Sequence, residues 1–258
     1  MDKNYLQNEL HQIQQWEKEQ EDIWFWEKLG KIPFAILDKL TPTFLHQKID
    51  KILEEVTSYI HNGGRYLIKK ESIVSKFENL SSIEDIQHLH LSKMDEVADN
   101  IISSRKQFAT AQGATTGFGG LFTLAIDIPA VLGMSLKILQ EIAVCYGYDP
   151  FDEKERVFII KCLQFSSSDL VGKQTILEEI KDFNHGQQRN NSVSQVQSWR
   201  EVMTVYRDNY GWKKLFQMVP IAGMVFGAYL NRKTIEDVSE VGKMLYKKRR
   251  ILELLENE

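Results

Sequence analysis

The spacing of apolar residues along this chain predicts helices almost throughout. Long stretches repeat their apolar positions with a period near 3.6 residues, whereas runs of alternating apolar and polar residues between turn signals are scarce. We therefore see no convincing sheet. Away from two uncharged segments, the pattern predicts helices over residues 5–20, 42–61, 83–89, 93–111, 170–183 and 196–210.

Several helix ends carry local signals. Ser82 and Ser92 each precede an aspartate by three residues, a spacing that resembles a capping box and predicts a helix start. The helix through residues 136–146 should end at Gly147, which favours a left-handed turn. Asp152 should open the next helix and Thr234 the last one.

We expect a single all-α domain in which two central, apolar, glycine-containing helices are surrounded by amphipathic helices. Residues 1–80 are expected to form amino-terminal helices that carry an aromatic cluster and pack on the main domain, residues 81–258. The polar stretch at residues 184–195 is expected to be a surface loop rather than a domain boundary.

The first uncharged segment, residues 113–133, reads GATTGFGGLFTLAIDIPAVLG. Pro129 disfavours helical geometry at the preceding residue, and a charge at Asp127 is costly in lipid, so this segment is a poor transmembrane helix. The second segment, residues 215–231, is at the lower limit of spanning length. Small residues four apart allow close helix packing, so the two segments should either pack together in a core or enter a bilayer shallowly.

Asp127 has two interpretations. It can cap a helix that begins at Pro129, or it can act as an acid or base in an apolar setting, which would require a partner brought by the fold. Glu141 is too far along the same helix, about 21 Å away, to be that partner. We favour the structural role.

The amino-acid composition argues against some classes of function for this protein. With 32 basic and 36 acidic residues, a net charge of −4 gives no general field for nucleic acid, and 43% apolar residues supply a core. The amino terminus lacks the apolar stretch of a secretory signal, so we expect a cytoplasmic protein. Cys145 and Cys162 should be buried free thiols rather than a disulfide, a metal pair or a nucleophile.

Two further clusters bear on membranes. Trp24, Phe25 and Trp26, together with Trp16, lie near lysines, as in an interfacial anchor, although core packing of these rings is the simpler interpretation. The basic run KKRR at residues 247–250 could meet anionic headgroups, but acids follow it and a solvated face is expected. His88 and His90 point apart on a helix, and no P-loop is present, so we expect no metal site and no cofactor.

Three stretches of the chain resemble the EcsC family of bacterial proteins. They are GATTGFGGLFTLAIDIPAVLG at residues 113–133, LQEIAVCYGYDP at residues 139–150 and KLFQMVPIAGMVFGAYLN at residues 214–231. The resemblance covers roughly residues 91–246. It implies an association with bacterial membrane transport systems of the ABC type, and it carries no reaction. The family pattern maps onto candidate binding residues Gly113, Gly117, Gly120, Asp127, Pro129, Tyr146, Gly147, Asp149, Pro220, Gly223, Gly227 and Asn231.

We therefore expect a non-catalytic cytoplasmic protein at the inner membrane surface, bound to the membrane or to a transport complex, with no nucleic-acid partner. Trp24, Phe25 and Trp26 are the candidate membrane contacts. A lipid-binding protein with an apolar pocket is one alternative. A hydrolase-like enzyme that uses Asp127 is another.

Overall fold

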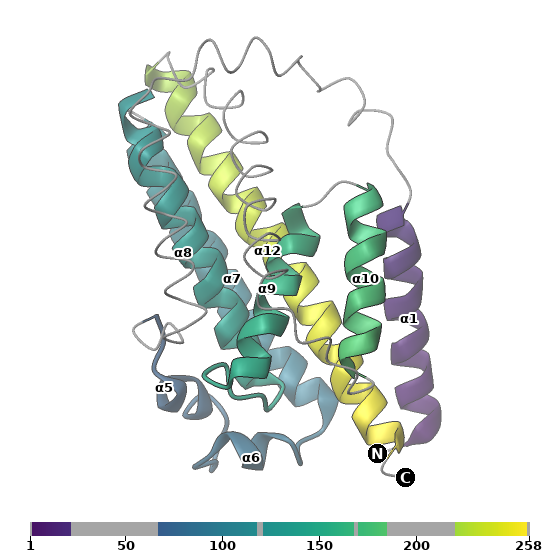
Figure 1. Ribbon diagram of the computed structural model, residues 1–258. Helices are drawn as coiled ribbons and strands as arrows, with labels where there is room; N and C mark the ends of the chain where they lie inside the picture. The colour runs from purple at the N-terminus through teal and green to yellow at the C-terminus, as the bar shows by residue number, and fades with distance from the viewer. Residues whose placement is uncertain (1, 22–66, 118–120, 168–169, 185–219, 257–258) are drawn as a thin grey trace.

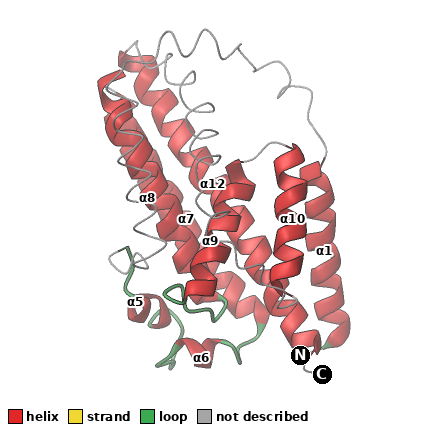
Figure 2. Ribbon diagram, in the orientation of Figure 1, coloured by secondary structure: helices red, strands yellow, loops and turns green. Residues whose placement is uncertain are grey.

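The computed structural model describes residues 2–21, 67–117, 121–167, 170–184 and 220–256. These residues form helices joined by loops, and no strand occurs among them (Figure 2). The all-α prediction is therefore confirmed. The helices are α1 (Lys3–Glu21), α5 (Lys70–Val74), α6 (Ile83–Ile86), α7 (Leu91–Gly117), α8 (Leu121–Cys145), α9 (Glu153–Ser167), α10 (Leu170–Asn184) and α12 (Pro220–Glu256).

Three long helices, α7, α8 and α12, lie side by side and give the molecule its length (Figure 1). Helices α1, α9 and α10 flank one part of this trio, and the short helices α5 and α6 lie at the same end. We call this part the base. The opposite part, made of residues 108–117 of α7, 121–136 of α8 and 220–231 of α12, is called the glycine end.

Helices α7 and α12 pack together and run antiparallel. Asp95 on α7 pairs with Lys247 on α12, and Asp99 one turn later pairs with Lys243 one turn earlier. At the other end of the contact, the backbones of Gly113 and Gly227 meet. These pairs fix one register along the entire seam between the two helices.

Helix α8 runs parallel to α12. Its residues Leu139 and Ile142 lie against Gly242 of α12, where an added Cβ would come within 2.6 Å of Leu139 Cδ2. About two turns further along α12, Arg250 reaches the backbone carbonyl of Tyr146. Both α8 and α12 therefore run from the glycine end to the base, where their carboxyl ends lie together.

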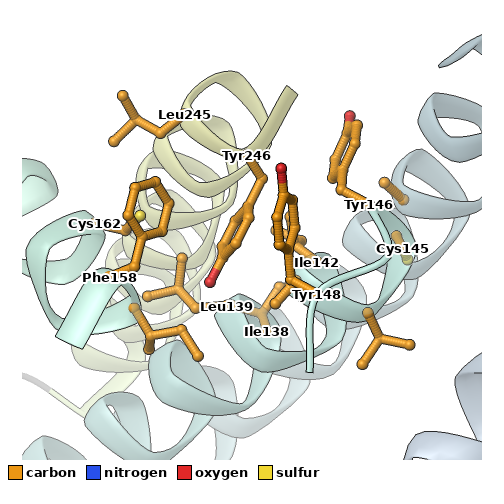
Figure 3. Close-up of a cluster of buried hydrophobic side chains, with 14 of the residues drawn as sticks. Ile138, Leu139, Ile142, Cys145, Tyr146, Tyr148, Phe158, Cys162, Leu245 and Tyr246 are labelled. Atoms are coloured by element: carbon orange, nitrogen blue, oxygen red, sulfur yellow. The ribbon is translucent and has the colours of Figure 1, made fainter. Parts of the chain in front are cut away.

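A cluster of buried apolar side chains lies at the base (Figure 3). The ring of Tyr246 packs edge-on against Phe158 at a centroid distance of 4.8 Å and lies 5.4 Å from the ring of Tyr148. Cys145 and Cys162 are fully buried free thiols, as predicted, and burial raises the pKa of both. Neither thiol is therefore readily ionised for nucleophilic chemistry.

The expected helix break at Pro129 is wrong. Helix α7 continues to Gly117, and α8 begins at Leu121 and passes through Ile128 and Pro129 without interruption. Proline in a helix interior loses one backbone hydrogen bond, at a cost of about 3 kcal/mol. Packing of α8 against both α7 and α12 offsets that cost. Asp127 therefore lies inside a helix, beyond its first turn, and the interpretation as a cap is also wrong.

Two of the predicted helix starts are confirmed and two are wrong. Helix α9 begins at Glu153, directly after Asp152, as predicted. Ser82 and Asp85 form the reciprocal capping box that their spacing predicts. Ser92 does not cap α7, because the ring of His90 accepts the backbone N–H of Ser92 and the helix begins at Leu91. Thr234 lies in the interior of α12, where its hydroxyl donates to the carbonyl of Leu230.

Some predictions fall outside the described residues. They include the helices over residues 42–61 and 196–210, all but the first residue of the loop at 184–195, and the aromatic residues Trp24, Phe25 and Trp26. Among the helices that the structure does describe, none combines the length and the apolar character required to span a bilayer.

Candidate functional site

The basic run at residues 247–250 is buried at the base, not solvated. Lys247 lies between Glu9 of α1 and Asp95 of α7, with Nζ 2.5 and 2.7 Å from the two carboxylates. Lys248 contacts both carboxylate oxygens of Glu17 at 2.7 Å. The interpretation as a solvated face is therefore wrong, because the partners come from elements that are distant in sequence.

The two arginines of the run bind inward as well. Arg249 contacts Glu155 of α9 at 2.7 Å, and both guanidinium groups stack on the ring of Tyr148, at 4.2 Å for Arg249 and 4.6 Å for Arg250. Burial raises the pKa of Glu155, while Arg249 acts in the opposite direction. Cations that are matched in this way are not available to lipid phosphates.

Tyr146 and Gly147 end helix α8 with a Schellman motif. The backbone N–H of Tyr148 donates to the carbonyl of Ala143, and that of Gly147 donates to Val144. Gly147 has φ +80°, as its predicted left-handed role requires. A side chain at Gly147 would also collide with Gln87, whose amide donates to the Gly147 carbonyl.

Tyr146 and Asp149 at this turn bind other parts of the fold through their polar groups. Tyr146 donates its hydroxyl to Asp95 at 2.6 Å, and its carbonyl accepts two hydrogen bonds from the buried guanidinium of Arg250. Asp149 accepts the backbone N–H of Phe151 and pairs with Lys70 at 2.5 Å. Tyr146, Gly147 and Asp149 therefore hold the base together. A binding role for them stays a prediction.

At the glycine end, α7 and α12 meet through their backbones, whereas at the base they are joined by ion pairs. An added Cβ at Gly113 would lie 2.2 Å from the carbonyl oxygen of Gly227, so the backbones of α7 and α12 touch there. Asn231 is one turn further along α12, and the register places it opposite Ala109, one turn back from Gly113. The side chain of Asn231 is 1% exposed, and both its oxygen and its nitrogen lack a hydrogen-bond partner.

Ion pairs mark the boundary between the two parts. Arg105 of α7 donates two hydrogen bonds to the buried carboxylate of Glu141 on α8, at 2.5 and 2.7 Å, and this pairing raises the pKa of Arg105. Its neighbour Lys106 pairs with Glu236 of α12 and lowers the pKa of that carboxyl group. Beyond this layer, residues 108–117 and 220–231 contain no charged residue, and residues 121–136 contain only Asp127.

The candidate residues do not form one site. Tyr146, Gly147 and Asp149 lie at the base, whereas Gly113, Gly227 and Asn231 lie at the glycine end. Gly117 ends α7, Pro220 begins α12 and Gly223 follows within its first turn, while Gly120 lies outside the described residues. The side chains of Asp127 and Pro129 are not described.

Trp16 is the member of the predicted aromatic cluster that the structure describes. It is 7% exposed, donates its indole N–H to Glu240 at 2.8 Å and packs on Phe165. Core packing, rather than an interfacial anchor, is therefore confirmed for this one tryptophan. The sequence did not predict Glu240 as the partner of Trp16, nor the buried contacts that Asp95 and Glu141 make with other helices. Acidic residues at helical spacing resemble ordinary surface residues until the packing is known.

Comparison with known proteins gives the family. The model of the EcsC protein family matches residues 7–251. The chain belongs to the EcsC family. This match includes most of α1, beyond the residues that carry the sequence resemblance.

Two Bacillus subtilis (strain 168) proteins are similar to this EcsC-family chain over most of their length. One, "Uncharacterized protein YdbA", is 55% identical over 98% of this chain and 95% of that protein. The other, "Protein EcsC", is 27% identical over 84% of this chain and 89% of that protein. No solved structure matches the chain.

Proposed function

We propose that this EcsC-family chain is a non-catalytic protein that associates with the inner face of the cell membrane through its glycine end. The observation that carries the proposal is the change of character along α12. Its last 21 residues, 236–256, bind neighbouring helices through ion pairs, whereas residues 220–231 contain no charge and expose Val225 and Tyr229. Exposed apolar side chains on an uncharged helix end are typical of a surface that meets lipid or an apolar partner.

The arrangement at the glycine end supports shallow contact rather than a span. The described helices include none suited to crossing a bilayer. Gly113 and Gly227 instead bring α7 and α12 into backbone contact, which presents their outer faces as a narrow, rigid unit. An end whose only charged residue is Asp127 can enter the interfacial layer without rearranging the base.

The family resemblance extends the proposal to a partner. It implies an association with a membrane transport complex of the ABC type, which would place the same surface against membrane protein as well as lipid. An apolar lipid pocket and a hydrolase-like reaction at Asp127 stay alternatives, and no contact of the described residues favours either.

Fractionation of cells that express the chain at its native level tests the proposal. We expect the protein to sediment with membranes and to be released by alkaline carbonate, which removes peripheral proteins. Protein found only in the soluble fraction, together with no binding to lipid vesicles, would contradict the proposal. Retention after carbonate would contradict peripheral attachment and indicate inserted helices.

A further inference from the structure

One face of α12 presents an ordered series of exposed side chains. Val225 and Tyr229 are 68% and 60% exposed, and Arg232 and Lys233 follow them on the exposed surface. These residues are spaced by three and four positions, so they form one stripe along the helix. From the end of the molecule toward the base, the stripe passes from aliphatic to aromatic to basic.

The stripe faces away from the seam with α7. Gly227 and Asn231, which lie in that seam, are each two residues from Tyr229, or about 200° around the helix. Burial agrees, since Gly227 and Asn231 are buried and the four stripe residues are not. The stripe is therefore an outer surface that the described helices leave uncovered.

The basic end of the stripe differs from the buried basic run. Lys233 pairs with Asp237, one turn away on the same helix, at 2.7 Å. Among the described residues, no carboxylate lies within ion-pair distance of Arg232. Unlike residues 247–250, these two cations can reach an external anion.

The order of side chains matches the layers of a lipid surface. Val225 and Lys233 are eight residues apart, which corresponds to about 12 Å along an α-helix. Interfacial helices bury their apolar parts about 5 to 10 Å into the boundary between headgroups and acyl chains. Tyrosine is enriched at the headgroup level, and lysine and arginine reach the phosphates.

We propose that the amino-terminal end of α12 enters an anionic lipid surface with Val225 deepest, Tyr229 at the headgroups, and Arg232 and Lys233 at the phosphates. This inference rests on the proposed function and adds the contact surface, its orientation and the class of lipid. A protein partner would not require the three kinds of side chain to follow one another along the helix axis. A second copy of the chain is an outcome that the test separates.

The first experiment measures depth in the full chain. A cysteine replaces Val225, Tyr229 or, as a control at the far end of the same helix, Glu256, and each carries an environment-sensitive nitrobenzoxadiazole label. The native thiols do not interfere, because Cys145 and Cys162 are fully buried. Phosphatidylcholine vesicles with phosphatidylglycerol are added, with and without a quencher attached to the acyl chains.

We expect quenching to be strongest for Val225→Cys, weaker for Tyr229→Cys and absent for Glu256→Cys. Binding of the chain with the label at Val225→Cys unquenched would overturn this inference while leaving the proposed function intact. Absence of any vesicle binding would overturn the proposed function instead. A blue shift of this label without vesicles that grows with protein concentration would identify a second copy as the occupant and also overturn the inference.

The second experiment tests the class of lipid. Arg232→Gln with Lys233→Gln should weaken binding to anionic vesicles about tenfold, since each cation near an anionic surface contributes about 1 kcal/mol and Lys233 already has a partner. The matched control, Lys18→Gln with Lys154→Gln, removes two exposed cations outside the stripe and should change binding less than twofold. Equal losses in the two variants would overturn the assignment of the phosphates to this stripe.

Discussion

The two parts of α12 differ in how their side chains are matched. Between residues 236 and 256 its polar side chains are almost all matched, as when Lys247 joins α12 to both α1 and α7. Between residues 220 and 231 it has no charge, contacts α7 through backbone at Gly227, and buries one unmatched amide at Asn231. The base therefore combines an apolar core with paired charges, whereas the described contacts of α12 at the glycine end are close packing.

This difference matters for where a partner can bind. The buried ion pairs of the base cannot be exchanged for external contacts without leaving unpaired charges. Contact of Val225 and Tyr229 with lipid would break none of the ion pairs between helices that the described residues form, since the nearest of these, made by Arg105 and Lys106, lie at the boundary of the glycine end. Basic residues at the two ends of α12 therefore differ in burial and in pairing although they look alike in the sequence.

The largest expected effect is at the base. Lys247→Met should lower the free energy of unfolding by about 3 kcal/mol, because it leaves Glu9 and Asp95 facing each other without a cation. The same change at the exposed Lys233 should cost less than about 0.5 kcal/mol. Chemical denaturation of both variants measures the difference, and equal costs would remove the contrast between the two ends of α12.

The next effect concerns the backbone contact between α7 and α12 at the glycine end. Gly113→Ala should destabilise the protein by about 2 to 3 kcal/mol, since the new methyl group would press on the backbone of Gly227. Gly133→Ala, where nothing lies within 4 Å of the added carbon, should stabilise it by about 0.5 to 1 kcal/mol. Thermal unfolding distinguishes the two signs. A harmless Gly113→Ala would mean that α7 and α12 do not touch there.

These two glycines also show which features of the fold can be predicted from the sequence. Helix content, the stop at Gly147 and the capping box at Ser82 follow from local chemistry and were predictable. Gly113 and Gly133 belong to one apolar run, yet only contact with α12 separates their roles. The same holds for the basic run at 247–250, whose partners come from α1 and α9 as well as from its own helix.

A smaller effect is expected at Asn231. Its buried amide has no hydrogen-bond partner, so Asn231→Ala removes an unsatisfied group and introduces a better helix former. We expect a gain of about 1 kcal/mol in the free energy of unfolding. Loss of stability in denaturant titrations would show that the amide is paired and that the seam is more polar than its contacts indicate.

The smallest expected effect is a dependence on pH at the base. Burial raises the pKa of Glu155, so the folded state releases its proton less readily than the unfolded state does. The contribution of this group to stability is therefore complete below the unfolded pKa of about 4.3 and is lost as pH rises through the raised folded pKa.

Comparison with the Glu155→Gln variant isolates the pH-dependent contribution of Glu155 to the free energy of unfolding. The stability of the native chain minus that of the variant should increase as pH falls from neutral toward 4.3, by less than about 1 kcal/mol, as measured by denaturation at several pH values. The opposite trend would show that the pairing with Arg249 outweighs burial in setting the pKa of Glu155.

We propose that the glycine end, rather than the base, meets the membrane. Hydrogen exchange of the full chain with and without anionic vesicles tests it most directly, because backbone amides report both ends of α12 in one sample. We predict slower exchange over residues 220–231 when vesicles are present and unchanged exchange over residues 243–256. Protection of residues 243–256 with none at 220–231 would contradict the account.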